Sequence, residues 1–311
     1  MSDYKPMTQA LEPLLERAES ILRRLEHILP PAPKEPDWNN AIAYRWLGLD
    51  RHQEKLRPII HPKTLKLDDI RCIDRQRNLI SRNTRQFLRG LPANNVLLWG
   101  SRGTGKSSLI KALLNEYAGE GLRMVEMDRR HLAELPDVLE LLEDRPEKFI
   151  IYCDDLSFEA DDAGYKRLKA ALEGSLSGLA DNVLVYATSN RRHLLPEYQS
   201  ENQDARYHAG DKLQCEIHQG DTVEEKISLS ERFGLWLSFQ PFTQDEYLEI
   251  VRYWLEKLDA LPADWNAARL QALRFALARG SRSGRVAWQF ARDWAGKTIL
   301  EIDTFSGFAS D

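Results

Sequence analysis

Residues 96–107 read VLLWGSRGTGKS, in which a short apolar run leads into a loop with three glycines, a lysine and a serine. Residues 108–119, SLIKALLNEYAG, continue with helical periodicity. A GxxxxGK[ST] loop between a strand and a helix turns backbone N–H groups toward phosphate oxygens, and the positive end of the helix favours the same anions. The sequence therefore predicts that this loop binds the phosphates of a nucleotide, and ATP is the expected ligand.

Side chains of the loop add to this backbone cradle. Lys106 is expected to reach the β- and γ-phosphates, and Ser107 is expected to offer its hydroxyl to magnesium. Mg²⁺ is therefore the expected cofactor beside ATP. The residues expected to hold the nucleotide are Gly100, Ser101, Arg102, Gly103, Thr104, Gly105, Lys106, Ser107 and Ser108.

On both sides of the loop, strand-like runs alternate with helical segments. The runs cover residues 96–99, 123–127, 149–153, 183–187 and 235–239. This alternation predicts an α/β fold with a mainly parallel sheet between helices. After Phe242 the sequence has only helical patterns, the first of which begins with a capping box at Thr243–Glu246. A small helical domain should therefore close the chain.

The part before the core contains a second boundary. Apolar residues spaced three and four apart predict an amphipathic helix over about residues 12–29, and residues 30–36 (PPAPKEP) predict a stiff linker. The apolar stripe could pair with another helix, but we expect it to pack on the protein's own body. The expected domains are a helix with its linker at 1–36, a short helical segment at 37–67, an α/β core at 68–241 and a helical lid at 242–311.

Polar residues follow two of the predicted strands. Residues 149–155 (FIIYCDD) end in two carboxylates, of which Asp154 is expected to hold magnesium directly or through water. Asp155 could orient or deprotonate an attacking water, or cap a helix. Residues 183–190 (VLVYATSN) end in Asn190, which could hydrogen-bond the γ-phosphate or the water, or simply form a turn.

In their order along the chain, these motifs resemble the AAA+ ATPases. The resemblance adds Arg232-Phe-Gly234 before the last strand and Ser283-Gly284-Arg285 in the helical lid, and it covers about residues 68–294. Within that superfamily, the segments NVLLWGSRGTGKSSLIKALL, CDDLSFE, YATSNRRHLLPE and LSERFGLWLSF look like a bacterial group of predicted ATPases catalogued as domain of unknown function 815.

The resemblance implies a role for each matching residue. Lys106 and Ser107 correspond to Walker A, Asp154 and Asp155 to Walker B, and Asn190 to sensor 1. In the same way, Arg285 corresponds to sensor 2 in the lid.

The resemblance also implies an arginine that enters a neighbouring subunit's site. Arg232 is the first candidate for this arginine finger, and Arg191 and Arg192 are its rivals. Ile70 and Ile73, before the first core helix, are the expected contacts for adenine.

Composition excludes several other classes of protein. The 311 residues carry a net charge of −5, which provides no global basic field for nucleic acid. Cys72, Cys153 and Cys215 lie far apart without a CxxC pair, which argues against a zinc site or a disulfide framework. The acidic, proline-containing start and the lack of a run of membrane-spanning length predict a cytoplasmic protein with no membrane partner.

Three functions fit these features. The first is an ATPase that works as a homo-oligomer, with a ring possible, and remodels an unknown protein partner. The second is an ATPase that loads or remodels nucleic acid, supported by the spacing of Arg71, Arg75, Arg82, Arg85 and Arg89 on one helical face. The third is a nucleotide-gated scaffold with little turnover.

Overall fold

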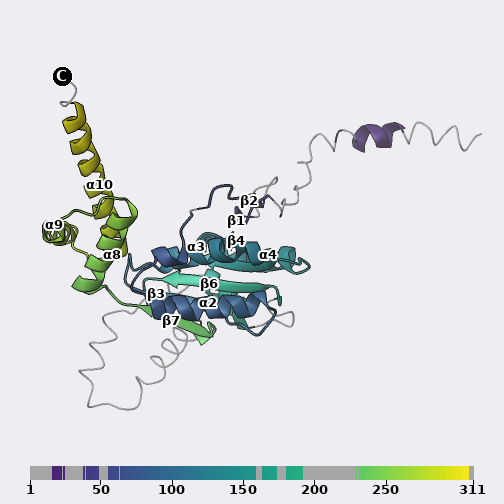
Figure 1. The fold of residues 1–311 in the computed structure, drawn as a ribbon. Helices are drawn as coiled ribbons and strands as arrows, with labels where there is room; N and C mark the ends of the chain where they lie inside the picture. Colours follow the sequence, from purple (N-terminus) through teal and green to yellow (C-terminus); the bar gives the residue numbers. More distant parts are fainter. Residues whose placement is uncertain are drawn as a thin grey trace, which may run out of the picture.

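The computed structural model describes residues 16–22, 24, 38, 40–48, 55–62, 64–158, 163–173, 180–191, 229 and 231–307. Its centre is a seven-stranded sheet in the order β2-β1-β4-β5-β6-β3-β7 (Figure 1). The strands are β1 (Ala43–Trp46), β2 (Leu56–Pro58), β3 (Val96–Gly100), β4 (Leu122–Glu126), β5 (Lys148–Cys153), β6 (Val183–Ser189) and β7 (Leu235–Phe239). All neighbouring strands are parallel except β1 and β2. The α/β fold with a mainly parallel sheet is confirmed.

Alternation along the strands places the sheet between two cores. In β5, Ile150 and Tyr152 belong to one core, which also contains residues of α2 (Asp74–Leu88) and α3 (Lys106–Tyr117). Phe149, Ile151 and Cys153 belong to the other core, with residues of α4 (Leu135–Leu142) and α5 (Ala163–Glu173). Because both faces are covered, the strands are continuous apolar runs, as expected for a buried parallel sheet.

The strand order creates the point where a ligand can bind. β3 lies between β6 and β7, although β4 and β5 follow β3 in the chain. Parallel strands end at one edge of a sheet, and ligands of open α/β sheets bind beyond that edge where the order reverses. The loop after β3 and the polar ends of β5 and β6 therefore meet at this edge.

The segment at 37–67 was wrongly expected to be helical. Among its described residues, the elements before η1 are the strands β1 and β2, and β1 extends the parallel sheet beside β4. Tyr44 and Trp46 are buried on one face while Arg45 between them is exposed, a period of two that suits a strand. The aromatic residues Trp38, Tyr44 and Trp46 are compatible with a helix or a strand. This segment forms a strand because it pairs with the edge of β4. The sheet consequently begins before residue 68.

Two further helix predictions need correction. Arg71 was expected on the same helical face as Arg75, but α2 begins at Asp74, after the short 3-10 helix η1 (Leu67–Asp69) and a stretch without helix at 70–73. Arg71 is therefore outside this helix. Residues 16–22 are helical, but Ile21 and Leu22 are 51% and 59% exposed. The packing expected for that helix is therefore wrong for these residues. The remainder of the expected helix and its linker lies largely outside the described residues.

The lid consists of α8 (Gln244–Lys257), α9 (Trp265–Ala278) and α10 (Gly284–Gly307). The predicted capping box is present, because Thr243 Oγ1 accepts from the Glu246 N–H at 3.3 Å and the Glu246 carboxylate accepts from the Thr243 N–H at 2.7 Å. Figure 1 shows the three helices beside the core, on the side toward which the β6 arrow points. Among the described residues, no helix is both long and apolar enough to cross a bilayer.

A buried polar network attaches α2 to the sheet. The Asn83 amide donates to Asn94 O at 2.8 Å and to the Tyr186 hydroxyl at 3.0 Å, and its carbonyl accepts from the Asn94 N–H at 3.0 Å. Thr84 Oγ1 lies 2.9 Å from the same Tyr186 hydroxyl. These bonds hold the turn that leads into β3, and thus the start of the phosphate loop.

We expect Asn83→Ala to lower the free energy of unfolding by about 1–2 kcal/mol, because several hydrogen bonds of one buried side chain are lost together. Chemical denaturation measures this change. Asn78→Ala, at an exposed position of the same helix, is the matched control and should cost less than about 0.5 kcal/mol. Equal losses in both variants would show that the network does not contribute.

Candidate functional site

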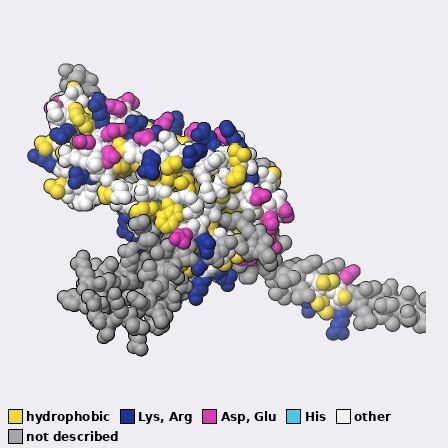
Figure 2. Space-filling model, turned by 90° about the horizontal axis from the view of Figure 1, so that it is seen from below, with side chains coloured by type: hydrophobic (Ala, Val, Ile, Leu, Met, Phe, Trp, Pro, Cys, Tyr) yellow, Lys and Arg dark blue, Asp and Glu magenta, His cyan; other side chains and the backbone are white. Residues whose placement is uncertain are grey.

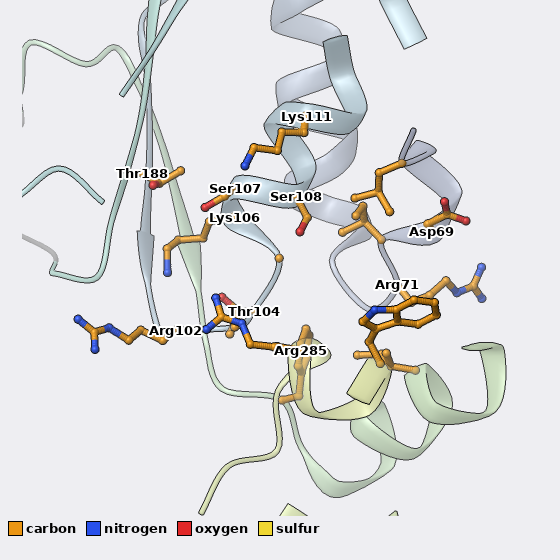
Figure 3. Close-up of a pocket in the computed structure, with 18 of the residues that line it drawn as sticks. Asp69, Arg71, Arg102, Thr104, Lys106, Ser107, Ser108, Lys111, Thr188 and Arg285 are labelled. Carbon is orange, nitrogen blue, oxygen red and sulfur yellow. The ribbon is translucent and has the colours of Figure 1, made fainter. Parts of the chain in front are cut away.

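A cavity of about 990 Å³ lies between the sheet edge and the lid. It is lined by the phosphate loop, the acids after β5, the end of β6 and residues of α8 and α10. Figure 3 shows Lys106 and Ser107 of the loop, Thr188 of β6 and Arg285 of α10 around it. This volume is at the upper end of the range for ligand pockets. Most residues predicted for the site are therefore brought to one cavity.

The backbone of the phosphate loop requires glycine at its two ends. Gly100 has φ +127, and a Cβ there would lie 2.1 Å from the carbonyl oxygen of Phe239 in β7. Gly105 has φ +99 and precedes α3, so it lies where the first N–H groups of the helix are free to face an anion. The chain can form this tight turn against β7 because neither position has a side chain.

Lys106 is buried in the floor of the loop. Its ammonium donates to Gly100 O at 2.7 Å, to Ser101 O at 2.8 Å and to the Asn190 side-chain oxygen at 3.1 Å. Burial lowers the pKa of Lys106, whereas the nearby charges of Asp155 and Asp154 oppose that shift. The cation is thus held at the loop by acceptors at the carboxyl ends of β3 and β6.

Asp154 forms the centre of a second group. One carboxylate oxygen, Oδ1, accepts from Ser107 Oγ at 2.7 Å and from Thr188 Oγ1 at 2.6 Å. Burial raises the pKa of Asp154, but these hydrogen bonds and the charge of Lys111 outweigh it and leave the pKa below its usual value. An ionised carboxylate beside a serine hydroxyl is the donor set that suits Mg²⁺.

Asp155 is held by β6. Its backbone N–H donates to Thr188 Oγ1 at 2.9 Å, and its carboxylate accepts from the Asn190 amide. Asp155 has φ +51, and residues 156–158 are not helical, so it does not cap a helix there. Asn190 therefore connects Lys106 to Asp155 through the two ends of one amide.

These features satisfy the requirements of a magnesium nucleotide. The loop offers glycines that admit phosphate to the backbone, a buried ammonium, and a free helix start. Mg²⁺ commonly takes one or two carboxylates together with substrate phosphates and waters, and Ser107 with Asp154 supplies such a partial set. The residues present therefore fit both a nucleotide phosphate chain and Mg²⁺.

The lid closes the phosphate side of the cavity. The Gly284 N–H donates to Gly103 O at 2.9 Å, so α10 begins against the loop itself. A Cβ on Gly103 would lie 2.8 Å from the side chain of Ser283. Arg285 follows at the start of α10 and lines the cavity, and Figure 3 shows it extending toward the loop beside Thr104.

A second set of contacts holds α8 to the segment before α2. Asp69 is 6% exposed and accepts from the Tyr253 hydroxyl at 2.7 Å and from the Lys257 ammonium. Burial raises the pKa of Asp69, but the bonds from Lys257 and Tyr253 lower it further than burial raises it. Arg71 Nη2 lies 3.4 Å from Glu249 Oε1, and Arg71 Cζ lies 5.2 Å from the centre of the Tyr253 ring. The cavity therefore lies between two attachments of the lid.

The two predicted adenine contacts differ. Ile70 lines the cavity and lies close to the loop, since a Cβ added to Gly105 would be 3.3 Å from Ile70 Cγ2. Ile73 is buried and supports the same glycine from behind, without lining the cavity. Its expected contact with adenine is therefore not supported. Gly100 and Ser101 likewise lie outside the cavity lining and contribute carbonyls to Lys106 instead.

The candidate arginine fingers do not line this cavity. Arg232 is exposed and lies just before β7, at the end opposite Phe239, which pairs with Gly100 of the loop. Arg191 is exposed directly after Asn190. Arg192 lies outside the described residues.

Several lining residues were not found from the sequence. Thr188 lies two residues before Asn190 at the polar end of β6. Its hydroxyl donates to the Asp154 carboxylate and accepts from the Asp155 N–H. Lys111 is one helical turn after Ser107, so the period of α3 could have revealed it, and Figure 3 shows its amine directed toward the Ser107 side. Trp254 and Trp288 of the lid have ring centres 4.5 Å apart and carry no signal in the sequence.

The sheet order, the phosphate loop at the carboxyl end of β3, the paired acids after β5 and the helical lid define an AAA+ P-loop NTPase fold. The chain belongs to the family described as "Protein of unknown function (DUF815)", whose profile matches residues 39–298. This agrees with the resemblance found in the motifs. No curated protein matches the chain.

Solved structures are similar to the chain only at low identity. RuvB of Thermotoga maritima, in the form with a single threonine-to-valine change, has a TM-score of 0.48 at 17% identity, covering 73% of this chain and 63% of its own. The RuvB Holliday junction branch migration motor of the same organism has 0.46 at 16%, covering 74% and 64%. The Aeropyrum pernix Orc1 protein in complex with DNA has 0.46 at 16%, covering 72% and 61%. The chain thus spans less than two thirds of each of these proteins.

We expect Thr188→Val to lower the free energy of unfolding by about 1–3 kcal/mol, because Asp154 loses a donor and the Asp155 N–H loses its acceptor. Denaturation of the nucleotide-free protein measures the change, and Thr188→Ser, which keeps the hydroxyl, should restore most of it. If the valine variant is as stable as the wild type, Thr188 does not support the two acids.

Proposed function

We propose that the protein binds ATP with Mg²⁺ and hydrolyses it to ADP and phosphate. The observation that carries this proposal is the hydrogen-bonded chain from Lys106 through Asn190 to Asp155, next to the Ser107–Asp154 pair. It combines a cation, a metal-binding carboxylate and a second carboxylate within one cavity. Phosphoryl transfer to water needs this combination, because the reaction depends on positioning and on charge stabilisation.

Each side chain has a separate task in this proposal. Lys106 and the loop N–H groups bind and orient the phosphates, while Ser107 and Asp154 would hold Mg²⁺. The metal, when bound, supplies positive charge to the phosphate oxygens. Asp155 accepts a proton from the attacking water or orients it, and Asn190 fixes the carboxylate of Asp155 relative to Lys106. Arg285 adds positive charge from the lid, and Ile70 contacts the base.

We further propose that the active form is a homo-oligomer. The support is the position of Arg232, which is exposed beside the edge strand β7 and outside the cavity of its own chain. β7 has five residues, so its amino end is about 16 Å from the loop edge of the sheet. An arginine there can complete the site of a second copy more readily than its own. Remodelling of a protein partner would follow from movement of the lid relative to the core.

Lys106→Ala and Asp155→Asn should separate binding from turnover. The first variant should lose ATP binding, because the cation among the loop carbonyls is removed. The second should still bind ATP but lose about 10²–10⁴ in turnover, the range for a proton acceptor. Calorimetric titration and phosphate release measure the two effects, with circular dichroism to confirm folding. A folded Lys106→Ala protein that binds ATP normally would remove the proposal, and wild-type binding without turnover would indicate a nucleotide-gated scaffold.

Arg232→Ala should bind ATP nearly normally but lose about a thousandfold or more in turnover, as expected when an arginine finger is absent. Mixing it with Lys106→Ala should partly restore turnover, because an intact Lys106 site can then face an intact Arg232 of another copy. Turnover per chain should also rise with protein concentration. Turnover that is independent of concentration, together with no rescue, would mean that one chain completes the site.

A further inference from the structure

One face of α2 carries an unusual set of side chains. The positions three and four residues apart along its exposed side are Arg75, Asn78, Arg82, Arg85 and Arg89, the last at the C-cap. All five are exposed, while Ile80 and Phe87 on the opposite side are buried in the core. At 100° per residue they occupy an arc of about 80° and a length of about 21 Å. We call these five residues the arginine stripe.

The charges of the arginine stripe are not neutralised within the described residues. None of its four arginines forms an ion pair with any described acid. The helix has one acid, Asp74, and that carboxylate is bonded to Arg77, outside the stripe. Arg71 is not part of the stripe, because it lies before the helix and pairs with Glu249. Four positive charges therefore face solvent in a single row.

The surroundings make this row distinct. The chain has a net charge of −5, and the face seen in Figure 2 shows basic, acidic and hydrophobic side chains intermixed. A general attraction to polyanions is therefore absent, and any such contact has to come from a local array. Four like charges on one helical face also repel one another, and an external anion would relieve that repulsion.

The composition of the stripe selects among possible anions. It has no apolar side chain, so it does not provide the hydrophobic face that a membrane-bound helix buries. It also has no aromatic residue on which unpaired bases could stack. An arginine guanidinium group can donate two hydrogen bonds to the oxygens of one phosphate. The row is about 21 Å long, which corresponds to about six base pairs of a duplex at 3.4 Å each.

We propose that the arginine stripe binds the phosphate backbone of duplex nucleic acid without reading its sequence. The four guanidinium groups contact phosphates, and Asn78 adds a neutral hydrogen bond within the row. This binding is separate from the nucleotide site, since no residue of the stripe lines the cavity.

Fluorescence anisotropy with a labelled duplex of about 24 base pairs tests the proposal. Four phosphate contacts predict that the logarithm of the affinity falls with the logarithm of salt concentration at a slope of about −3.6. Arg82→Gln with Arg85→Gln should reduce that slope by about 2 and weaken binding at least tenfold in about 50 mM salt. The matched control is Arg269→Gln with Arg274→Gln, which removes the same charge from exposed positions of α9 and should leave both values unchanged.

The outcomes are distinct from those for the ATPase. Arg82→Lys with Arg85→Lys should retain the salt slope, and a single strand of the same sequence should bind more weakly than the duplex. Undetectable duplex binding by the wild type in about 50 mM salt overturns the proposal, as does an equal loss in the control pair or tighter binding of the single strand. ATP binding measured on the same variants should be normal in every case, so failure here leaves the nucleotide site unaffected.

Discussion

The buried charge of Lys106 is the constraint on which the site depends. An ammonium taken from water is costly unless hydrogen bonds and opposite charges replace its hydration. Gly100 and Ser101 provide two carbonyls at the end of β3, and Asn190 provides an amide oxygen at the end of β6. The acids that follow β5 supply the opposing charge. The ends of three strands, β3, β6 and β5, therefore converge around one cation.

The lid depends on the same arrangement. Its contact between Gly284 and Gly103 is possible only where the loop passes without side chains, and its contact through Asp69 uses a carboxylate from the segment that also places Ile70 in the cavity. Nucleotide would thus contact core and lid together. In the proposed function, a change in how the lid packs would change the geometry around Arg285, so the position of the lid and the bound nucleotide would be coupled.

α2 lies between the cavity and the arginine stripe. The segment just before it lines the cavity through Ile70 and Arg71, its inner face binds the turn before β3 through Asn83, and its outer face carries the arginine stripe. One helix therefore lies between the proposed nucleotide site and the arginine stripe. The interpretation of the arginine stripe depends on two observations: its arginines are exposed, and they form no ion pair with a described acid.

The sequence alone predicted the phosphate loop, the five core strands to within two residues, and the capping box of α8, because glycine conformation, apolar runs and helix caps are local properties. It also predicted Asp154, Asp155 and Asn190 as strand-end residues. Tertiary structure alone decided that residues 43–46 form a strand, since the free edge of β4 is remote in sequence. It likewise decided the roles of Thr188, Trp254 and Trp288 and the exclusion of Arg71 from α2. Such outcomes depend on which surfaces meet, and no local pattern encodes that.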